Sequence, residues 1–266
     1  MINELNWNIN EKNAKEYIDA CIESIDNKNF SNFKQNSKYR TILEGGDKTT
    51  FDYFLGKIRQ LDNKSVFFSN LDSFRKNDSY GNPDLYDDPE IGKFSLTTLK
   101  YVYNALEISD YIKDSNPKKI VEIGGGYGGL SVVLNEILDF DEYVLIDLPE
   151  VCQLVEKYTS KFKNLKKKVR TISYFDIDNH DFIDTDLTIA INSLSECNLE
   201  YQMKYFNQII SKSKYSYVVR NLFSPQAVEE HRTTIDSLPD NFLYDDTNKV
   251  EEIYSQNIIV YIKRND

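Results

Sequence analysis

The chain has 266 residues, of which 40% are hydrophobic, and a formal net charge of −11. The hydrophobic content suffices for a real core, whereas the negative charge argues against nucleic acid or an anionic membrane as the main partner. The chain has three cysteines without C-x-x-C spacing, which argues against a disulfide framework and a zinc site. The N-terminus is polar and no apolar run approaches ~20 residues, which argues against a signal peptide and an integral membrane segment. We therefore expect a cytoplasmic protein.

Residues 1–115 are predicted to form a helical N-terminal extension before a second domain at residues 116–266. Apolar side chains recur at helical spacing over residues 14–25, and a second amphipathic stretch covers residues 50–61. Trp7 is interpreted as a packing anchor rather than a ligand platform.

Residues 76–92 are dense in turn-forming residues and lie shortly before the second domain. Long polar loops in such a place often carry ligands. One interpretation is therefore a lid whose Tyr80, Asn82 and Tyr86 close over an acceptor molecule, and the other is a plain connector. A helix over residues 95–112 is expected to follow, ended by an Asn-Pro pair.

The most informative stretch covers residues 119–150. An apolar strand pattern at residues 120–123 leads into five glycines in six positions, and a helical pattern continues to about residue 138. A second strand at residues 143–146 ends at Asp147. Glycine permits a sharp turn and the close approach of a ligand, and a helix N-terminus favours an anionic group. An acid at the end of the second strand can accept hydrogen bonds from a ribose diol, so this unit predicts a nucleotide-type ligand.

Strands and helices alternate through the rest of the chain. Strands are predicted at residues 169–175, 187–191, 215–219 and 256–264, and helices at residues 149–162, from 198 onward, and at 225–238. Ligands of open α/β sheets bind beyond the carboxyl ends of the strands. Asp176 after the third strand, and Asn192, Ser195 and Glu196 after the fourth, are therefore expected near the ligand.

An acid two residues before the first glycine makes the turn more specific. The pattern E-x-G-x-G-x-G from Glu122 resembles motif I of the class I, Rossmann-like S-adenosylmethionine-dependent methyltransferases. The resemblance implies an α/β fold with a seven-stranded Rossmann-like sheet, helices on both faces and a final antiparallel strand. It also implies S-adenosyl-L-methionine as the cofactor, with Glu122 near its methionine end, Asp147 on its ribose and Asp176 near its adenine. The cofactor-binding residues expected on this basis are Glu122, Gly124, Gly125, Gly126, Tyr127, Asp147, Leu148, Phe175, Asp176 and Asn192.

Three segments, IVEIGGGYGG, YVLIDLPE and INSLSECNLEYQMKYFNQII, are together similar to the sugar O-methyltransferase family of bacterial and viral polysaccharide synthesis. Upstream, a Gly-Asn-Pro at residues 81–83 and residues 94–106 are similar to the substrate-side segment of that family. The resemblance implies methyl transfer to a sugar hydroxyl of a glycan, a polysaccharide or a nucleotide-sugar precursor. The substrate-side residues expected on this basis are Tyr80, Asn82, Tyr86, Ser195, Arg220 and Asn221.

Methyl transfer to a hydroxyl usually needs a base that removes the proton. Glu196 is the first candidate catalytic residue, with helix capping as its alternative role. His231, in a charged helical stretch, is the second candidate, with a solvated helix face as its alternative. The Asp-rich loops are compatible with a divalent metal, but no fixed ligand spacing indicates one, so no residue is assigned to a metal.

Two other functions fit parts of this pattern. An NAD(P)-dependent oxidoreductase would use the same glycine-rich turn, and a non-catalytic methyltransferase-like partner domain would retain only the fold. The complete motif with both downstream acids favours the methyltransferase. The sequence leaves the particular sugar, its hydroxyl and the oligomeric state open, a homo-oligomer included.

Overall fold

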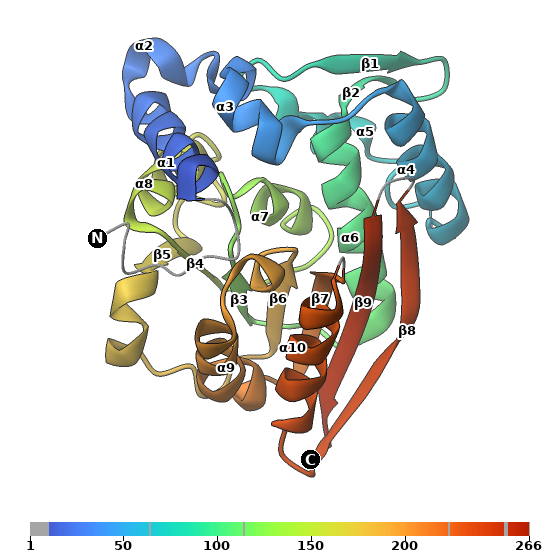
Figure 1. Cartoon of the computed structure of the whole chain (residues 1–266). Coiled ribbons are helices and arrows are strands. Elements are labelled where there is room, and N and C mark those ends of the chain that lie inside the picture. Colours follow the sequence, from blue (N-terminus) through green and yellow to red (C-terminus); the bar gives the residue numbers. More distant parts are fainter. Residues whose placement is uncertain (1–10, 64, 114, 223, 253–254, 266) are drawn as a thin grey trace.

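A seven-stranded mixed sheet lies at the centre of the computed structural model, which describes residues 11–63, 65–113, 115–222, 224–252 and 255–265 (Figure 1). The strand order is β5-β4-β3-β6-β7-β9-β8. Its strands are β3 (Lys119–Ile123), β4 (Glu142–Asp147), β5 (Val169–Ser173), β6 (Leu187–Ile191), β7 (Tyr215–Asn221), β8 (Phe242–Glu252) and β9 (Ser255–Arg264). Strands β3 to β7 pair in parallel, and β9 is antiparallel to both β7 and β8. The predicted Rossmann-like sheet with a final antiparallel strand is therefore confirmed.

Helices cover both faces of this sheet. They are α1 (Glu11–Ile25), α2 (Asn27–Phe30), α3 (Ser37–Tyr39), α4 (Lys48–Leu61), α5 (Leu71–Arg75), α6 (Leu96–Ile112), α7 (Gly129–Leu134), α8 (Pro149–Thr159), α9 (Leu199–Gln208) and α10 (Pro225–Asp236). Among the described residues, no helix is both long and apolar enough to cross a membrane.

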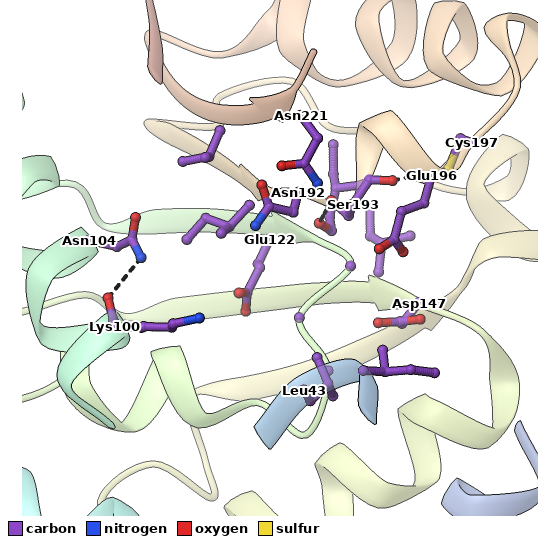
Figure 2. Close-up of a pocket in the computed structure, with 18 of the residues that line it drawn as sticks. Leu43, Lys100, Asn104, Glu122, Asp147, Asn192, Ser193, Glu196, Cys197 and Asn221 are labelled. Carbon is purple, nitrogen blue, oxygen red and sulfur yellow. Dashed lines mark hydrogen bonds between the residues drawn. The ribbon is translucent and has the colours of Figure 1, made fainter. Parts of the chain in front are cut away.

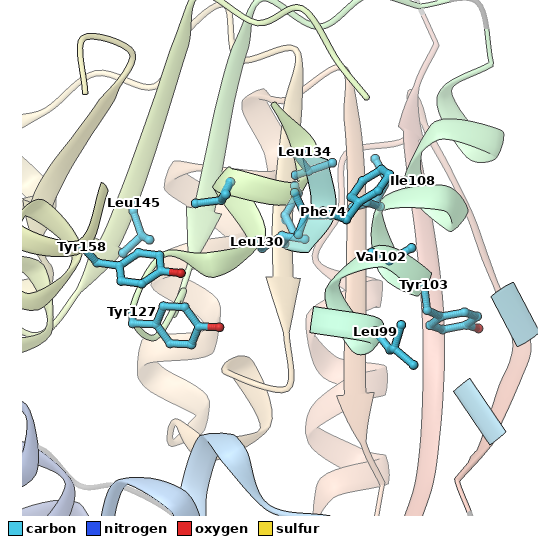
Figure 3. Packing of buried hydrophobic residues seen from close by; sticks show 14 of the residues in the cluster. Phe74, Leu99, Val102, Tyr103, Ile108, Tyr127, Leu130, Leu134, Leu145 and Tyr158 are labelled. Atoms are coloured by element: carbon cyan, nitrogen blue, oxygen red, sulfur yellow. The ribbon is translucent and has the colours of Figure 1, made fainter. Parts of the chain in front are cut away.

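Side-chain alternation along the strands divides the core into two clusters. On β4, Tyr143 and Leu145 join the larger cluster with α1, α4, α6, α7 and α8, part of which is drawn in Figure 3. Val144 and Ile146 point the other way and join the smaller cluster with α9 and α10. Because both faces are covered, these strands are almost continuously apolar, which explains why their positions could be predicted.

The two helices predicted in the N-terminal extension are confirmed as α1 and α4. Buried Tyr17, Phe51 and Ile58 belong to the same hydrophobic cluster as the sheet residues, so the extension packs into the main core. Trp7 lies outside the described residues.

The predicted loop at residues 76–92 contains a two-stranded antiparallel sheet. Its strands are β1 (Leu85–Asp88) and β2 (Gly92–Ser95). All three expected lid side chains contact the N-terminal region. The Tyr80 ring lies 6.4 Å from that of Phe30 between centroids, and Asn82 Nδ2 and Tyr86 OH donate hydrogen bonds of 2.6 and 2.8 Å to that region. This segment therefore joins the extension to α6.

Two of the predicted boundaries that differ from the structure have a clear local reason. Helix α7 ends at Leu134 rather than near residue 138, because the N–H groups of Glu136 and Ile137 bond to carbonyls three residues back, as in a 3₁₀ turn. Strand β5 ends at Ser173 rather than residue 175, because Ser173 Oγ accepts the N–H of Phe175 and starts a 3₁₀ segment.

Strand β8 was not predicted, although a seven-stranded sheet was. Its sequence, FLYDDTNKVEE, is largely polar, as expected of an edge strand that pairs only with β9. Helices α8 and α10 begin at the predicted prolines and end two or three residues earlier than predicted.

Asn77 is a fully buried polar residue that joins four parts of the chain. Its Nδ2 donates to Thr98 Oγ1 on α6 at 2.9 Å and to Tyr127 OH beyond the glycine turn at 3.0 Å. Its Oδ1 accepts from Tyr158 OH on α8 at 2.9 Å, and its carbonyl oxygen accepts from the buried ammonium of Lys34 at 3.0 Å. Tyr127 and Tyr158 pack closely, with 4.7 Å between ring centroids (Figure 3). Burial lowers the pKa of Lys34, whose ammonium lies 4.3 Å from the centre of the Tyr127 ring.

Asn77→Ala is expected to lower the free energy of unfolding by about 1–3 kcal/mol, because the buried hydroxyls of Tyr127 and Tyr158 lose side-chain partners. Urea denaturation measures this change. Asn207→Ala, on the exposed face of α9, is the matched control and should stay within ~0.5 kcal/mol of the wild type. A loss no larger than that of the control would contradict a stabilising role for the Asn77 side chain.

Candidate functional site

The carboxyl ends of β3, β4, β6 and β7 border one cavity of about 530 Å³ (Figure 2). Small-molecule sites typically span about 300–1,000 Å³. Strands β3 and β6 are neighbours in the sheet, but their following helices, α7 and α9, lie on opposite faces. The cavity therefore lies at the topological switch point, where open α/β sheets bind ligands.

The glycine turn after β3 forms the floor of this cavity. Gly124 has a φ of +73°, and a Cβ there would lie 2.2 Å from the Cβ of Ser193. A Cβ on Gly125 would lie 2.6 Å from Glu122 Oε2. The absence of a Cβ at these two glycines therefore lets the turn after β3 pack closely against the turn after β6 and against the Glu122 carboxylate.

Three carboxylates line the cavity from separate elements (Figure 2). Burial raises the pKa of Glu122 to about 7, opposed by a 2.7 Å hydrogen bond from Tyr143 OH. Burial also raises the pKa of Asp147 to about 7, opposed by backbone N–H groups of the neighbouring turns. The pKa of Glu196 rises to about 7 through burial and the nearby charge of Asp147. A ligand with positive charge would relieve the repulsion among these groups.

The opposite wall of the cavity comes from the N-terminal region and α6. Residues 41–43 belong to a π-helical segment, and Leu43 lies against Gly126. From α6, Lys100 and Asn104 project toward the cavity (Figure 2). Asn104 is held in place, because its Nδ2 donates to the Lys100 carbonyl at 2.8 Å and its Oδ1 accepts from Tyr217 OH at 2.8 Å.

Half of the predicted site residues line this cavity. They are Glu122, Gly124, Gly125, Gly126, Asp147, Leu148, Asn192, Glu196 and Asn221. Asn192 has a φ of +61°, and its Oδ1 is buried without a hydrogen-bond partner among the described residues. This oxygen is available as an acceptor for a ligand.

The other predicted residues lie outside the cavity lining. They are Tyr80, Asn82, Tyr86, Tyr127, Phe175, Asp176, Ser195, Arg220 and His231. The first three contact the N-terminal region, and Tyr127 turns inward to Asn77. Phe175 and Asp176 are exposed because β5 ends before them, and Tyr174 lines the cavity in their place.

Arg220 and Ser195 hold the polar turn that carries Glu196. Arg220 is almost fully buried and bonds to Gln202 Oε1, while Gln202 Nε2 donates to the Cys197 carbonyl at 2.8 Å. Ser195 Oγ accepts the backbone N–H of Asn221 at 2.9 Å. In the free protein these hydrogen bonds give Arg220 and Ser195 a positioning role, and their contacts with a substrate stay a prediction.

His231 is buried between α10 and β8, with its Nε2 3.2 Å from Asp246 Oδ2. Burial lowers its pKa below the ordinary value. Its place outside the cavity lining argues against the predicted catalytic role.

Several lining residues were not predicted individually, among them Leu43, Thr97, Lys100, Tyr101 and Asn257. Residues 94–106 were recognised as a substrate-side segment, but helical periodicity did not indicate which side chains face a ligand. Among the described residues, no group of three or more His, Cys, Asp or Glu side chains could hold a metal ion.

No protein-family model and no curated protein matches the chain. Similar solved structures include the methyltransferase domain of the bacterial protein CtHen1, at 10% identity and a TM-score of 0.47, covering 61% of this chain and 97% of that one. The mitomycin 7-O-methyltransferase MmcR has 15% identity and a TM-score of 0.45, covering 81% and 67%. A candidate O-methyltransferase from Nostoc punctiforme has 13% identity and a TM-score of 0.48, covering 63% of this chain and 58% of that one. All three TM-scores are below 0.5.

Glu196→Gln is expected to weaken the dependence of stability on pH. The pKa of Glu196 rises from 4.5 to about 7 on folding, so the folded state retains a proton that the unfolded state releases between these values. Its contribution to stability is complete below pH 4.5 and is lost as the pH rises to about 7. Urea denaturation over this range should show a smaller fall for the variant than for the wild type. Glu200→Gln, at the exposed start of α9, is the control and should show the same fall in unfolding free energy with pH as the wild type. An equal fall in all three proteins would contradict the raised pKa of Glu196.

Proposed function

We propose that this chain is an S-adenosylmethionine-dependent O-methyltransferase whose acceptor is a sugar hydroxyl of a glycan, a polysaccharide or a nucleotide-sugar precursor. The observation that carries the proposal is the set of three carboxylates, buried Glu122 and half-buried Asp147 and Glu196, around a glycine-floored cavity. S-adenosylmethionine differs from other nucleotide-type ligands because it has a positively charged sulfur and no phosphate. A cavity lined by acids suits such a ligand.

The residues of the cavity fit this cofactor. Asp147, at the end of β4, would accept hydrogen bonds from the ribose diol. Glu122 and the buried Oδ1 of Asn192 would hold the amino group. The sequence predicted that the N-terminus of the helix after the glycine turn would favour an anionic group. Helix α7 has only six residues, so we propose that the three acids, rather than this N-terminus, determine which charge of ligand the cavity prefers. When bound, the cofactor supplies a methyl group on its positively charged sulfur.

The position of Glu122 argues against a dinucleotide at this turn. The pyrophosphate of NAD(P) would bind against the glycine turn. The Glu122 carboxylate lies close to that turn, since its Oε2 would be 2.6 Å from a Cβ on Gly125. Repulsion between the carboxylate and the pyrophosphate favours the methyltransferase over the oxidoreductase.

Glu196 is the proposed base. The acceptor hydroxyl would lose its proton to Glu196 as its oxygen forms a bond to the methyl carbon, while the bond between that carbon and sulfur breaks and S-adenosylhomocysteine leaves. The walls of the cavity would hold the hydroxyl in line for this displacement. Burial gives Glu196 a pKa of about 7, which makes it a stronger base than an exposed glutamate and one that titrates near neutral pH. Arg220 and Gln202 keep its turn in place from behind.

The sugar acceptor is supported by the segments that resemble the sugar O-methyltransferases and by the side chains that α4, α6, β7 and β9 contribute to the cavity lining. Phe54, Tyr101 and Tyr103 offer aromatic rings, and Asn221 and Asn257 offer amides. This combination suits a ring that has an apolar face and several hydroxyl groups.

S-adenosylhomocysteine is expected to bind with a Kd in the micromolar range, about −8 kcal/mol. Asp147→Ala should weaken binding by roughly 1.5–3 kcal/mol, because the ribose loses a charged acceptor. Asp141→Ala, at the exposed opposite end of β4, is the matched control and should bind as the wild type does. Isothermal titration calorimetry measures all three, with NADH as a second ligand. Binding of NADH without binding of S-adenosylhomocysteine would contradict the proposed methyltransferase function and support a dinucleotide-dependent enzyme.

Glu196→Gln is expected to lower kcat by ~10²–10⁴ while the affinity for S-adenosylhomocysteine stays nearly constant. Transfer of a labelled methyl group to a sugar acceptor measures the rate. The wild-type rate should rise with pH, with a midpoint at or below about 7, because the positive cofactor favours the ionised carboxylate. His231→Gln should retain turnover, since His231 lies outside the cavity lining. Near-full turnover of Glu196→Gln would remove Glu196 as the base.

A further inference from the structure

The cavity has an acidic end and a basic end. Lys100 is the only Lys or Arg among the described residues that line it. In Figure 2, Lys100 comes from α6 on the side opposite Asp147, and Glu122 lies between them. The cofactor proposed above would occupy the acidic end, so the basic end is left for the acceptor.

Lys100 has no strong partner among the described residues. Its ammonium lies 5.5 Å from the centroid of the Phe54 ring, and no ion pair joins it to a described carboxylate. A cation–π contact at this distance is weak beside a charge-assisted hydrogen bond to an anion. The chain has a net charge of −11, so Lys100 places a positive charge in the cavity of a protein that is negative as a whole.

Asn257 is a second, independent sign of a ligand in this part of the cavity. Its side chain is only 3% exposed and lines the cavity, yet its Oδ1 has no hydrogen-bond partner among the described residues. Asn257 on β9 pairs in register with Asn221 on β7, which lines the same cavity. A buried amide oxygen without a partner is costly, so a donor on a ligand would satisfy it.

The packing of α6 places Lys100 toward the end of the sheet that carries these two amides. Tyr111 OH donates to the Ile262 carbonyl on β9, and one turn earlier on α6, Glu107 accepts from Tyr261 OH. Asn104 then contacts β7. The N-terminal end of α6 therefore lies toward the carboxyl end of β7. Lys100, one further turn back, lies on the side of the sheet end that carries Asn221 and Asn257.

We infer that Lys100, Asn221 and Asn257 form the acceptor subsite, and that the acceptor is a sugar carrying an anionic group, either a carboxylate or a phosphate. Lys100 pairs with the anionic group, and Asn257 Oδ1 accepts a hydrogen bond from a sugar hydroxyl. This inference rests on the proposed function and adds the charge of the substrate to it.

Calorimetry on protein saturated with S-adenosylhomocysteine tests the subsite. The probes are D-glucuronate, D-glucose 6-phosphate and uncharged D-glucose at constant ionic strength. At least one anion should bind, at least about tenfold more tightly than D-glucose, and the better of the two identifies a carboxylate or a phosphate. Lys100→Gln should weaken the binding of that anion by about 10- to 100-fold, and Lys100→Arg should restore part of the affinity. Lys57→Gln is the matched control, because the Lys57 ammonium also lies 5.5 Å from an aromatic ring centroid, that of Tyr53, but outside the cavity lining.

Three results would overturn the subsite: neither anion binds, D-glucose binds as tightly as the anions, or Lys100→Gln binds the anion as the wild type does. Each variant is first titrated with S-adenosylhomocysteine, which should bind equally in all of them. Loss of that binding in the wild type would overturn the proposed function as well. Binding of S-adenosylhomocysteine without any preference for an anion would overturn the subsite alone.

Discussion

The buried side chain of Asn77 is the constraint on which the site depends. An amide in the core must find partners for both its N–H groups and its oxygen, because an unsatisfied buried polar group costs about 1–3 kcal/mol. Asn77 finds them on α6, on α8 and at Tyr127, directly after the glycine turn. The position of the turn is therefore set by the helices above the sheet as well as by β3. Buried Lys34 adds the N-terminal region to the same network.

This network explains why the helical extension is part of the site rather than an addition to it. The segment that leads from Lys34 toward α4 includes Leu43, which lies against Gly126 and closes one side of the cavity. Tyr17 and Phe54, from α1 and α4, line the cavity as well. On the other face of the sheet, buried Arg220 holds the turn after β6 through Gln202. The cavity is thus held from both sides by polar groups that contact no ligand themselves.

The charge distribution of the cavity has a cost in the free protein. The full burial of Glu122 and the partial burial of Asp147 and Glu196 raise their pKa values to about 7, and this opposes folding at neutral pH. Functional sites commonly retain such unfavourable groups because they contribute to binding or chemistry. Here Asp147 and Glu196 lie at one end and Lys100 at the other, with Glu122 between them (Figure 2), so that a positive ligand and an anionic one would each meet the opposite charge.

The order of strands, glycine turn and helices could be predicted because apolar runs buried on both faces, glycines and helix-starting prolines are local signals. Glu122, Asp147, Asn192 and Glu196 could be placed near one cavity because each is at or just beyond the carboxyl end of a parallel strand, and these ends meet at one edge of the sheet. The directions of Tyr127, Arg220 and His231, and the parts played by Lys100 and Asn257, could not be predicted in this way. They depend on which face of α6 packs on β7, on where β5 ends and on hydrogen bonds between residues far apart in the chain. Those contacts exist only after the helices have packed onto the sheet, so tertiary structure alone separates a residue that supports the cavity from one that lines it.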